Sequence, residues 1–161
     1  MAEPLIVALP KGRLTEEQGA AQVAETLGLI TGTTSYDAFG DVDFVVEAVP
    51  ERMEIKQAVF AEIEQIVADD AVLATNTSSL SVAEIGAKLA HPERLVGFHF
   101  FNPVAVMPLI EVVRVASTSD EALATAMATA KKLGKTAVIT AAATSASTLG
   151  DRMLVAGLLR A

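Results

Sequence analysis

Three polar side chains stand out in an otherwise apolar stretch of the sequence: Ser78, His99 and Glu111. A histidine acts as a general base near neutral pH when a carboxylate fixes its tautomer, and Glu111, on a neighbouring extended segment, could do this for His99. Ser78 could donate a hydrogen bond to a substrate carbonyl, or act as a nucleophile if His99 reached its hydroxyl. The residue types and their spacing therefore predict an acid–base site.

The same side chains also have structural interpretations, which the local pattern leaves open. His99 lies between two phenylalanines and could be a hydrogen-bonded histidine of the core. Ser78 and Ser79 could cap a helix that begins near Val82, a use that the local pattern favours. Residue types alone do not choose between these interpretations and the catalytic one.

The elements that must position these groups alternate between strand-like and helix-like segments, which indicates an α/β layered fold. An apolar run at 42–49 fits a parallel strand that is covered on both faces. The other strands are expected at 5–9, 29–36 (a short strand leading into a turn), 71–76, 94–100, 107–115 and 136–140. Helices are expected at 14–28, 51–68, 81–90 and 119–134, with a short apolar helix near the C-terminal end.

Polar groups follow three of these strands, at residues 47–51, 76–79 and 99–102. Ligand sites of parallel α/β sheets lie beyond the carboxyl ends of the strands. We therefore expect the three groups to converge at one edge of the sheet.

Composition excludes several classes of protein. The net charge of −8 argues against a nucleic-acid surface, and no apolar run reaches the roughly 20 residues of a membrane span. The chain has no cysteine, so a cytoplasmic setting is the default expectation. Hydrophobic residues make up 52% of one small domain, which leads us to expect a homo-oligomer that buries apolar surface.

Four segments carry a resemblance to a known family: "FVVEAVPERMEIKQAVFAEIE", "LATNTSSLSVAEI", "PERLVGFHFFNPVAVMPLIEVV" and "AKKLGKTAVI". They closely resemble the NAD-binding domain of bacterial 3-hydroxyacyl-CoA dehydrogenases, including 3-hydroxybutyryl-CoA dehydrogenases. The resemblance covers about residues 11–140, and "NTSSL" followed by "HFFNP" is its most specific part. It implies a partial Rossmann-like three-layer fold with a mostly parallel sheet, NAD as the cofactor and an acyl-CoA substrate.

The resemblance also assigns roles to individual residues. His99 would abstract the 3-hydroxyl proton, and Glu111 would orient and support that histidine. Ser78 would bond the substrate oxygen, and Asn102 would line the same pocket. The residues expected on the cofactor side are Glu51, Lys56 and Asn76.

The sequence departs from the family pattern at both ends. No GxGxxG stands anywhere in it, and residues 1–10 and 141–161 are atypical. A glycine turn lets the backbone approach a pyrophosphate at a helix N-terminus. We therefore expect a single truncated Rossmann-like domain over 1–161 that lacks the first βαβ unit and has lost hydride transfer. The sheet edge exposed in this way would also seek a partner.

Two other functions stay open. Ser78, His99 and Glu111 are the residue types of an acyl-transfer triad, which suggests a small hydrolase of esters or phosphoesters. A divalent metal such as zinc, bound by His99, Glu111 and Asp151, could activate water for the same reaction. The third possibility is a folded fragment without catalysis.

Overall fold

The computed structural model of the chain describes residues 28–30, 32–37 and 39–141. The predictions of a strand at 5–9, a helix at 14–28 and a short helix near the C-terminal end lie outside this part, apart from Gly28. Within the described residues no helix combines the length and the apolar character that crossing a membrane requires.

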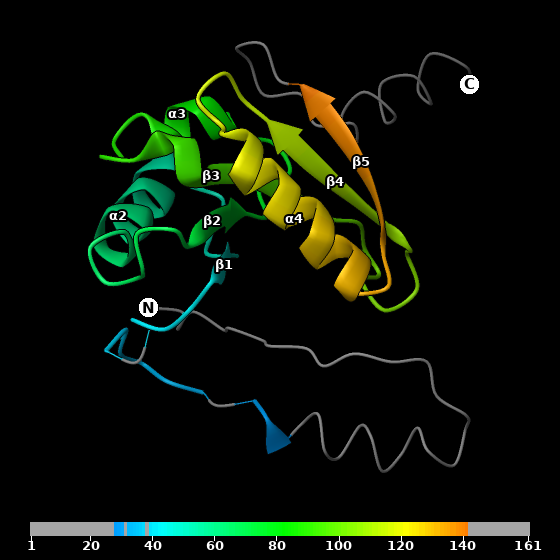
Figure 1. Ribbon diagram of the computed structural model, residues 1–161, viewed down its shortest axis with the longest axis horizontal. Coiled ribbons are helices and arrows are strands. Elements are labelled where there is room, and N and C mark those ends of the chain that lie inside the picture. Colours follow the sequence, from blue (N-terminus) through cyan, green and yellow to red (C-terminus); the bar gives the residue numbers. More distant parts are fainter. Residues whose placement is uncertain (1–27, 31, 38, 142–161) are drawn as a thin grey trace.

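The described residues form a five-stranded sheet whose strands lie side by side in chain order (Figure 1). The strands are β1 (Phe44–Glu47), β2 (Val72–Thr75), β3 (Leu95–Phe100), β4 (Leu109–Arg114) and β5 (Thr136–Ala141). Neighbouring strands pair in parallel, except that β3 and β4 are antiparallel. Among these five strands the direction changes once, between β3 and β4, and this change decides which side chains face each other there.

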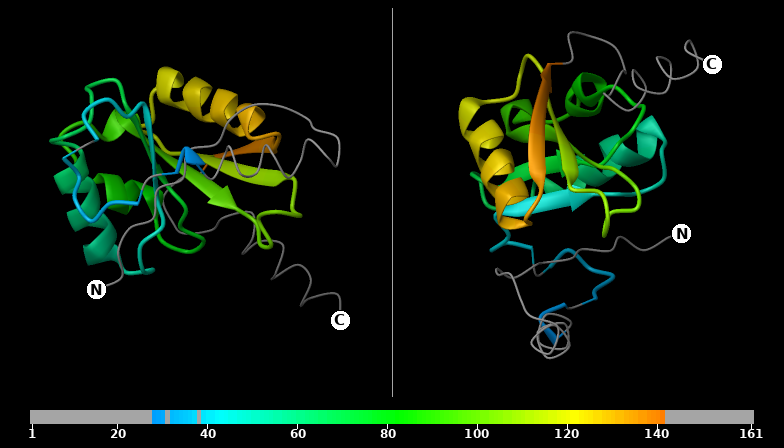
Figure 2. Two further views of the ribbon diagram at one scale, coloured as in Figure 1. Left: turned by 90° about the horizontal axis from the view of Figure 1, so that it is seen from below. Right: turned by 90° about the vertical axis from the view of Figure 1, so that its right-hand side faces the viewer.

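Helices cover both faces of the sheet. They are α2 (Met53–Ile63), α3 (Val82–Gly86) and α4 (Asp120–Lys132), and a 3-10 turn, Pro92–Arg94, leads into β3. Figure 2 shows α4 on one face and α2 and α3 on the other. The predicted three-layer, mostly parallel α/β fold is therefore confirmed.

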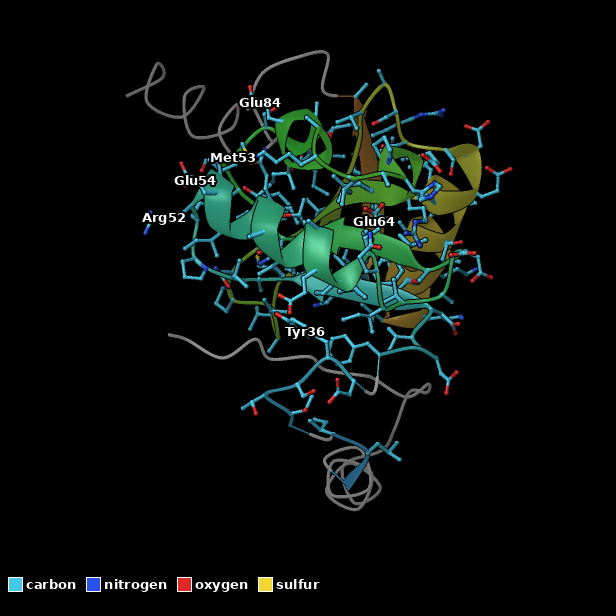
Figure 3. All side chains as sticks on the ribbon, turned by 90° about the vertical axis from the view of Figure 1, so that its left-hand side faces the viewer. Tyr36, Arg52, Met53, Glu54, Glu64 and Glu84 are labelled. Atoms are coloured by element: carbon cyan, nitrogen blue, oxygen red, sulfur yellow. The ribbon has the colours of Figure 1, made fainter. Side chains whose placement is uncertain are left out.

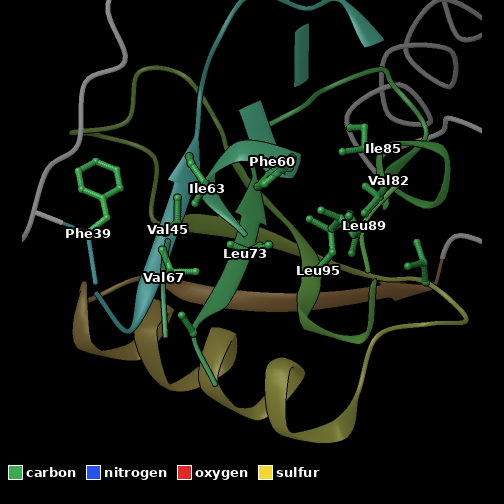
Figure 4. Packing of buried hydrophobic residues seen from close by; sticks show 13 residues of the cluster. Phe39, Val45, Phe60, Ile63, Val67, Leu73, Val82, Ile85, Leu89 and Leu95 are labelled. Atoms are coloured by element: carbon green, nitrogen blue, oxygen red, sulfur yellow. The ribbon is translucent and has the colours of Figure 1, made fainter. Parts of the chain in front are cut away.

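Alternation along the strands divides the apolar side chains between two cores. Leu73 and Leu95 pack with Phe60 beneath α2 and α3, in the cluster drawn in Figure 4. Their neighbours Ala74 and Val96 point to the other face and pack beneath α4. Because β2 and β3 are buried on both faces, their sequences are continuous apolar runs rather than alternating ones.

Serine side chains cap the N-termini of α3 and α4. The serine that caps α3 is not one of the two that we expected. Ser119 caps α4 by accepting a hydrogen bond from the Ala122 amide at 3.1 Å. Ser81 caps α3 by accepting from the Glu84 amide at 3.3 Å, so the prediction that Ser78 or Ser79 caps this helix is wrong.

The other predicted elements among the described residues are recovered, with shorter bounds except for β5, which extends one residue further, to Ala141. The strand expected at 29–36 is the exception. The described residues of that segment form turns and irregular backbone. The Thr33 hydroxyl accepts from the Ser35 amide at 3.0 Å, and the Ser35 hydroxyl accepts from the Asp37 amide at 3.1 Å. Such local bonds satisfy the backbone without a neighbouring strand, which explains why the strand does not form here.

Gly97 sets the close approach of β3 to β4. A Cβ at this position would lie 2.6 Å from the Cβ of Val113 and 3.3 Å from a methyl group of Val82. Gly97→Ala should therefore lower the free energy of unfolding by about 1–3 kcal/mol, because a packed core has no room for a further methyl group. Urea unfolding measures the loss. Gly40→Ala is the control, since its Cβ would meet no atom closer than 3.9 Å; equal unfolding midpoints for the two variants would contradict the argument.

Candidate active site

The loops that follow β1, β2 and β3 meet at one edge of the sheet. The Glu51 carboxylate, after β1, accepts hydrogen bonds from the backbone amides of Ser78 at 3.1 Å and Ser79 at 3.2 Å, both after β2. Asn76 connects β2 to the end of β3, because its side-chain oxygen accepts from the Phe100 amide at 2.9 Å. The expected convergence of the three polar groups is therefore found.

His99 and Glu111 face each other across the single antiparallel strand pair. They are register partners on β3 and β4, and His99 Nδ1 lies 3.3 Å from Glu111 Oε2. The Glu111 side chain is fully buried, whereas that of His99 keeps 12% of its surface exposed. The His99 ring also packs against Phe101, with 4.8 Å between the ring centroids. Since Nδ1 faces the carboxylate, Nε2 is the nitrogen that can exchange a proton with a substrate.

A buried charge network supports the neighbouring part of the site. The Lys56 ammonium lies 2.7 Å from a carboxylate oxygen of Glu47 and 3.1 Å from one of Glu51. The other oxygen of Glu47 accepts from the Thr75 hydroxyl at 2.7 Å. A lysine that is 1% exposed needs such partners, because an unpaired buried charge is costly. The structure thus places the Lys56 ammonium between two carboxylates, and its expected role on the cofactor side stays a prediction.

Glu51 is held in its ionised form by its neighbours. Burial raises its pKa, but hydrogen bonds from Thr77 and Lys56, the positive charge of Lys56 and the Ser79 amide outweigh burial and lower the pKa to about 2. The Thr77 hydroxyl and the Ser79 hydroxyl both donate to the same carboxylate oxygen. Glu51 therefore fixes the turn that carries Ser78.

Of the remaining predicted site residues, the structure describes Ser78 and Asn102. Ser78 is exposed and Asn102 lies exposed in the connection between β3 and β4. Asp151 lies outside the described residues. Within the part of the chain that the structure describes, no group of three or more His, Asp or Glu residues could hold a metal ion.

Two partnerships in this region were not expected from the sequence: that of Glu47 with Lys56, and that of Thr140 with Glu111. Glu47 had an identifiable sequence feature: it is a carboxylate inside the apolar run "DFVVEAV" and is followed nine residues later by Lys56. Such a charge in a buried strand indicates a paired group. Thr140, whose hydroxyl donates to Glu111 at 3.0 Å, had none, because a threonine is ordinary in any strand.

A further buried carboxylate, Glu64, lies at the other end of α2 from Arg52, Met53 and Glu54 (Figure 3). It accepts from the amides of Ala90 at 2.9 Å and His91 at 2.8 Å, and it lies 3.5 Å from the guanidinium of Arg94. The His91 ring is exposed and lies beside Glu93. This cluster ties α2 to the turn before β3 and shares no contact with the site at the opposite edge.

The pyrophosphate of a dinucleotide does not fit the strand-to-helix turns that the structure describes. The turns from β1 to α2 (48–52) and from β2 to α3 (76–81) contain no glycine. The first contains Pro50, and its Glu51 carboxylate, with a pKa of about 2, would repel an anion there. The backbone of these turns therefore provides no close, electropositive approach for a diphosphate.

A mostly parallel sheet with helices on both faces defines a Rossmann-like α/β domain, and the histidine–glutamate pair lies between its strands β3 and β4. The chain belongs to the family of the 3-hydroxyacyl-CoA dehydrogenase, NAD binding domain, which matches residues 5–143.

Related proteins agree with this assignment. The chain is 53% identical over 127 residues to the fatty acid oxidation complex subunit alpha of Pseudomonas syringae pv. syringae. The match covers 79% of this chain and 17% of the relative. The corresponding subunit of Pseudomonas putida is 54% identical over 125 residues, with 78% of this chain and 17% of the relative covered. The chain therefore spans 17% of the length of these relatives.

Solved structures show the same fold. A 3-hydroxybutyryl-CoA dehydrogenase from Escherichia coli K12 is 37% identical with a TM-score of 0.73, over 81% of this chain and 27% of that protein. An (S)-3-hydroxybutyryl-CoA dehydrogenase from Ralstonia eutropha is 36% identical with a TM-score of 0.77, over 84% of this chain and 47% of that protein.

The low pKa of Glu51 predicts a dependence of stability on pH. A carboxyl group with a folded-state pKa of about 2, below its ordinary 4.5, stabilises the fold above pH 4.5 and loses this contribution as the pH falls toward 2. Glu51→Gln should therefore be less stable than the wild type above pH 4.5, and the difference should narrow as the pH falls through this range. Urea unfolding at a series of pH values measures it. Glu54→Gln, at an exposed position on α2, is the control for the loss of a surface charge, and a constant difference for Glu51→Gln would contradict the argument.

Proposed function

We propose that this chain carries the proton-transfer half of a 3-hydroxyacyl-CoA dehydrogenase. The observation that carries the proposal is the pairing of His99 Nδ1 with Glu111 Oε2 at 3.3 Å, with the carboxylate fully buried. A buried carboxylate beside one imidazole nitrogen stabilises the imidazolium that forms when the other nitrogen takes a proton. The family to which the chain belongs acts as independent support.

In the proposed chemistry, His99 would take the proton of the 3-hydroxyl group while a separate acceptor takes the hydride from C3, and in the reverse direction it would return the proton to the 3-keto oxygen as C3 receives a hydride. Glu111 holds the ring and stabilises its charge. Ser78 donates a hydrogen bond to the substrate oxygen, and Asn102 lines the pocket beside it. General acid–base catalysis of this kind contributes typically 10²- to 10⁴-fold to the rate.

We propose a short 3-hydroxyacyl thioester of CoA as the substrate, because two structural relatives are described as 3-hydroxybutyryl-CoA dehydrogenases. Oxidation at C3 also needs a hydride acceptor. Glu51, Lys56 and Asn76 are the residues we expect on the side of NAD. The pyrophosphate of NAD does not fit the turns after β1 and β2. We therefore propose that this chain does not complete hydride transfer on its own.

No observation in the described residues favours the other functions. The hydrolase with Ser78 as its nucleophile has no specific geometric support, and the described residues provide no group for zinc. The homo-oligomer and the cytoplasmic setting stay predictions.

The test uses the purified 161-residue chain with acetoacetyl-CoA as the probe. Ligand binding raises the unfolding temperature of the native state, so the wild type should show a shift that depends on ligand concentration. His99→Gln should bind roughly fivefold more weakly, as expected for one lost hydrogen bond. NADH should cause no shift.

His91→Gln is the matched control, because the ring of His91 is exposed beside Glu93, away from this site. It should bind acetoacetyl-CoA like the wild type. Equal binding by His99→Gln and the wild type would remove His99 from the site. Oxidation of NADH by the chain in the presence of acetoacetyl-CoA would instead show that hydride transfer is intact.

A further inference from the structure

The Glu111 carboxylate is held from two neighbouring strands at once. Its Oε2 atom faces His99 Nδ1 on β3, at 3.3 Å. Its Oε1 atom accepts a hydrogen bond from the hydroxyl of Thr140 on β5, at 3.0 Å. The two oxygens are thus divided between the proposed base and a residue to which the proposed chemistry assigns no role.

The sheet register explains why Thr140 reaches this carboxylate. In the parallel pair of β4 and β5, Glu111 lies opposite Val138 and Val113 lies opposite Thr140. Residues two apart on a strand share a face, so Glu111, Val113, Val138 and Thr140 all lie on the face that carries α2 and α3. The threonine hydroxyl therefore approaches the carboxylate from the side opposite His99.

The chemistry of the contact has one direction. An ionised carboxylate only accepts hydrogen bonds, so the Thr140 hydroxyl is the donor in this contact. The last side-chain torsion of a glutamate has broad, roughly two-fold preferences, so its own rotamer does not fix the plane of the carboxylate. Donors at both oxygens do fix it, and Thr140 is a donor at the oxygen remote from His99.

We propose that Thr140 is a positioning residue: its hydroxyl orients the Glu111 carboxylate so that His99 carries its proton on Nδ1 and keeps Nε2 available for the substrate. The inference rests on the proposed role of His99 as the base. Thr140 acts through Glu111 and does not touch the substrate.

The competing explanation is that Thr140 is present only as a β-branched residue of a strand. Two variants separate the explanations. Thr140→Val keeps the branched shape and removes the hydroxyl, whereas Thr140→Ser keeps the hydroxyl and removes the methyl group. A role in shape alone would leave the valine variant unaffected and would affect the serine variant.

The tautomer of His99 provides a readout that needs neither substrate nor cofactor. The full chain contains two histidines, so ¹⁵N NMR of the imidazole nitrogens, at a pH where both rings are neutral, resolves His99 beside His91. The ratio of the Nδ1–H to the Nε2–H form of His99 should fall roughly two- to tenfold in Thr140→Val, the effect of one ordinary hydrogen bond. Thr140→Ser should stay within about twofold of the wild type, and His91 should not change.

An unchanged or increased ratio in Thr140→Val would overturn the proposal, as would a serine variant that behaves like the valine variant. Thr140→Ala serves for the same comparison if the valine variant does not fold. In a Glu111→Met background, loss of the Thr140 hydroxyl should have no further effect on His99, because no carboxylate is left to orient. A tautomer change of the same size in that background would show that Thr140 acts by another route and would also overturn the proposal.

This result is independent of the binding experiment with acetoacetyl-CoA. If His99→Gln binds like the wild type while the tautomer depends on Thr140, the proposed function fails and the positioning role stands. If His99→Gln weakens binding of the probe and the tautomer ratio of His99 does not change in Thr140→Val, the proposed function stands and the positioning role fails.

Discussion

The cost of burying carboxylates inside an apolar sheet governs this structure. A carboxylate without partners in a protein interior is unfavourable by several kcal/mol, so each one must be surrounded by donors or cations. Glu47 is hydrogen-bonded by Lys56 and Thr75. Glu111 is contacted by the His99 ring and by the Thr140 hydroxyl. These partners lie on different strands and on α2. The hydrogen bonds to each carboxylate therefore hold several elements in fixed positions relative to one another.

The antiparallel pairing of β3 and β4 places one of these buried carboxylates, Glu111, opposite His99 and so forms the candidate active site. Residues directly opposite each other in an antiparallel pair bring their Cβ atoms within about 5 Å, close enough for His99 and Glu111 to interact. Gly97, two residues before His99, lets the strands approach closely where a Cβ would collide with Val113. The packing of the core and the geometry of the pair therefore depend on the same strand contact.

Glu51 shows a different use of charge at the same edge of the sheet. It lies in the turn after β1 and forms an ion pair with Lys56. It also accepts hydrogen bonds from the backbone amides of the turn that carries Ser78. A negative group at this position organises the backbone around it and repels anions. The turns after β1 and β2 therefore offer a diphosphate no close, electropositive approach, although the chain belongs to a family named for binding NAD.

The order of the elements, the layered α/β class and the convergence of three polar turns could be predicted from the sequence, because each depends on local patterns: apolar runs, capping residues and the strand ends at which polar groups stand. The pairing of His99 with Glu111 could be proposed from residue types and from the family resemblance, but its register could not. The ion pair of Glu47 with Lys56 and the contact of Thr140 with Glu111 were decided by the tertiary structure alone. Each depends on which residues of separate segments come within hydrogen-bonding distance, and sequence periodicity gives the face of a strand or helix but not the partner that lies opposite.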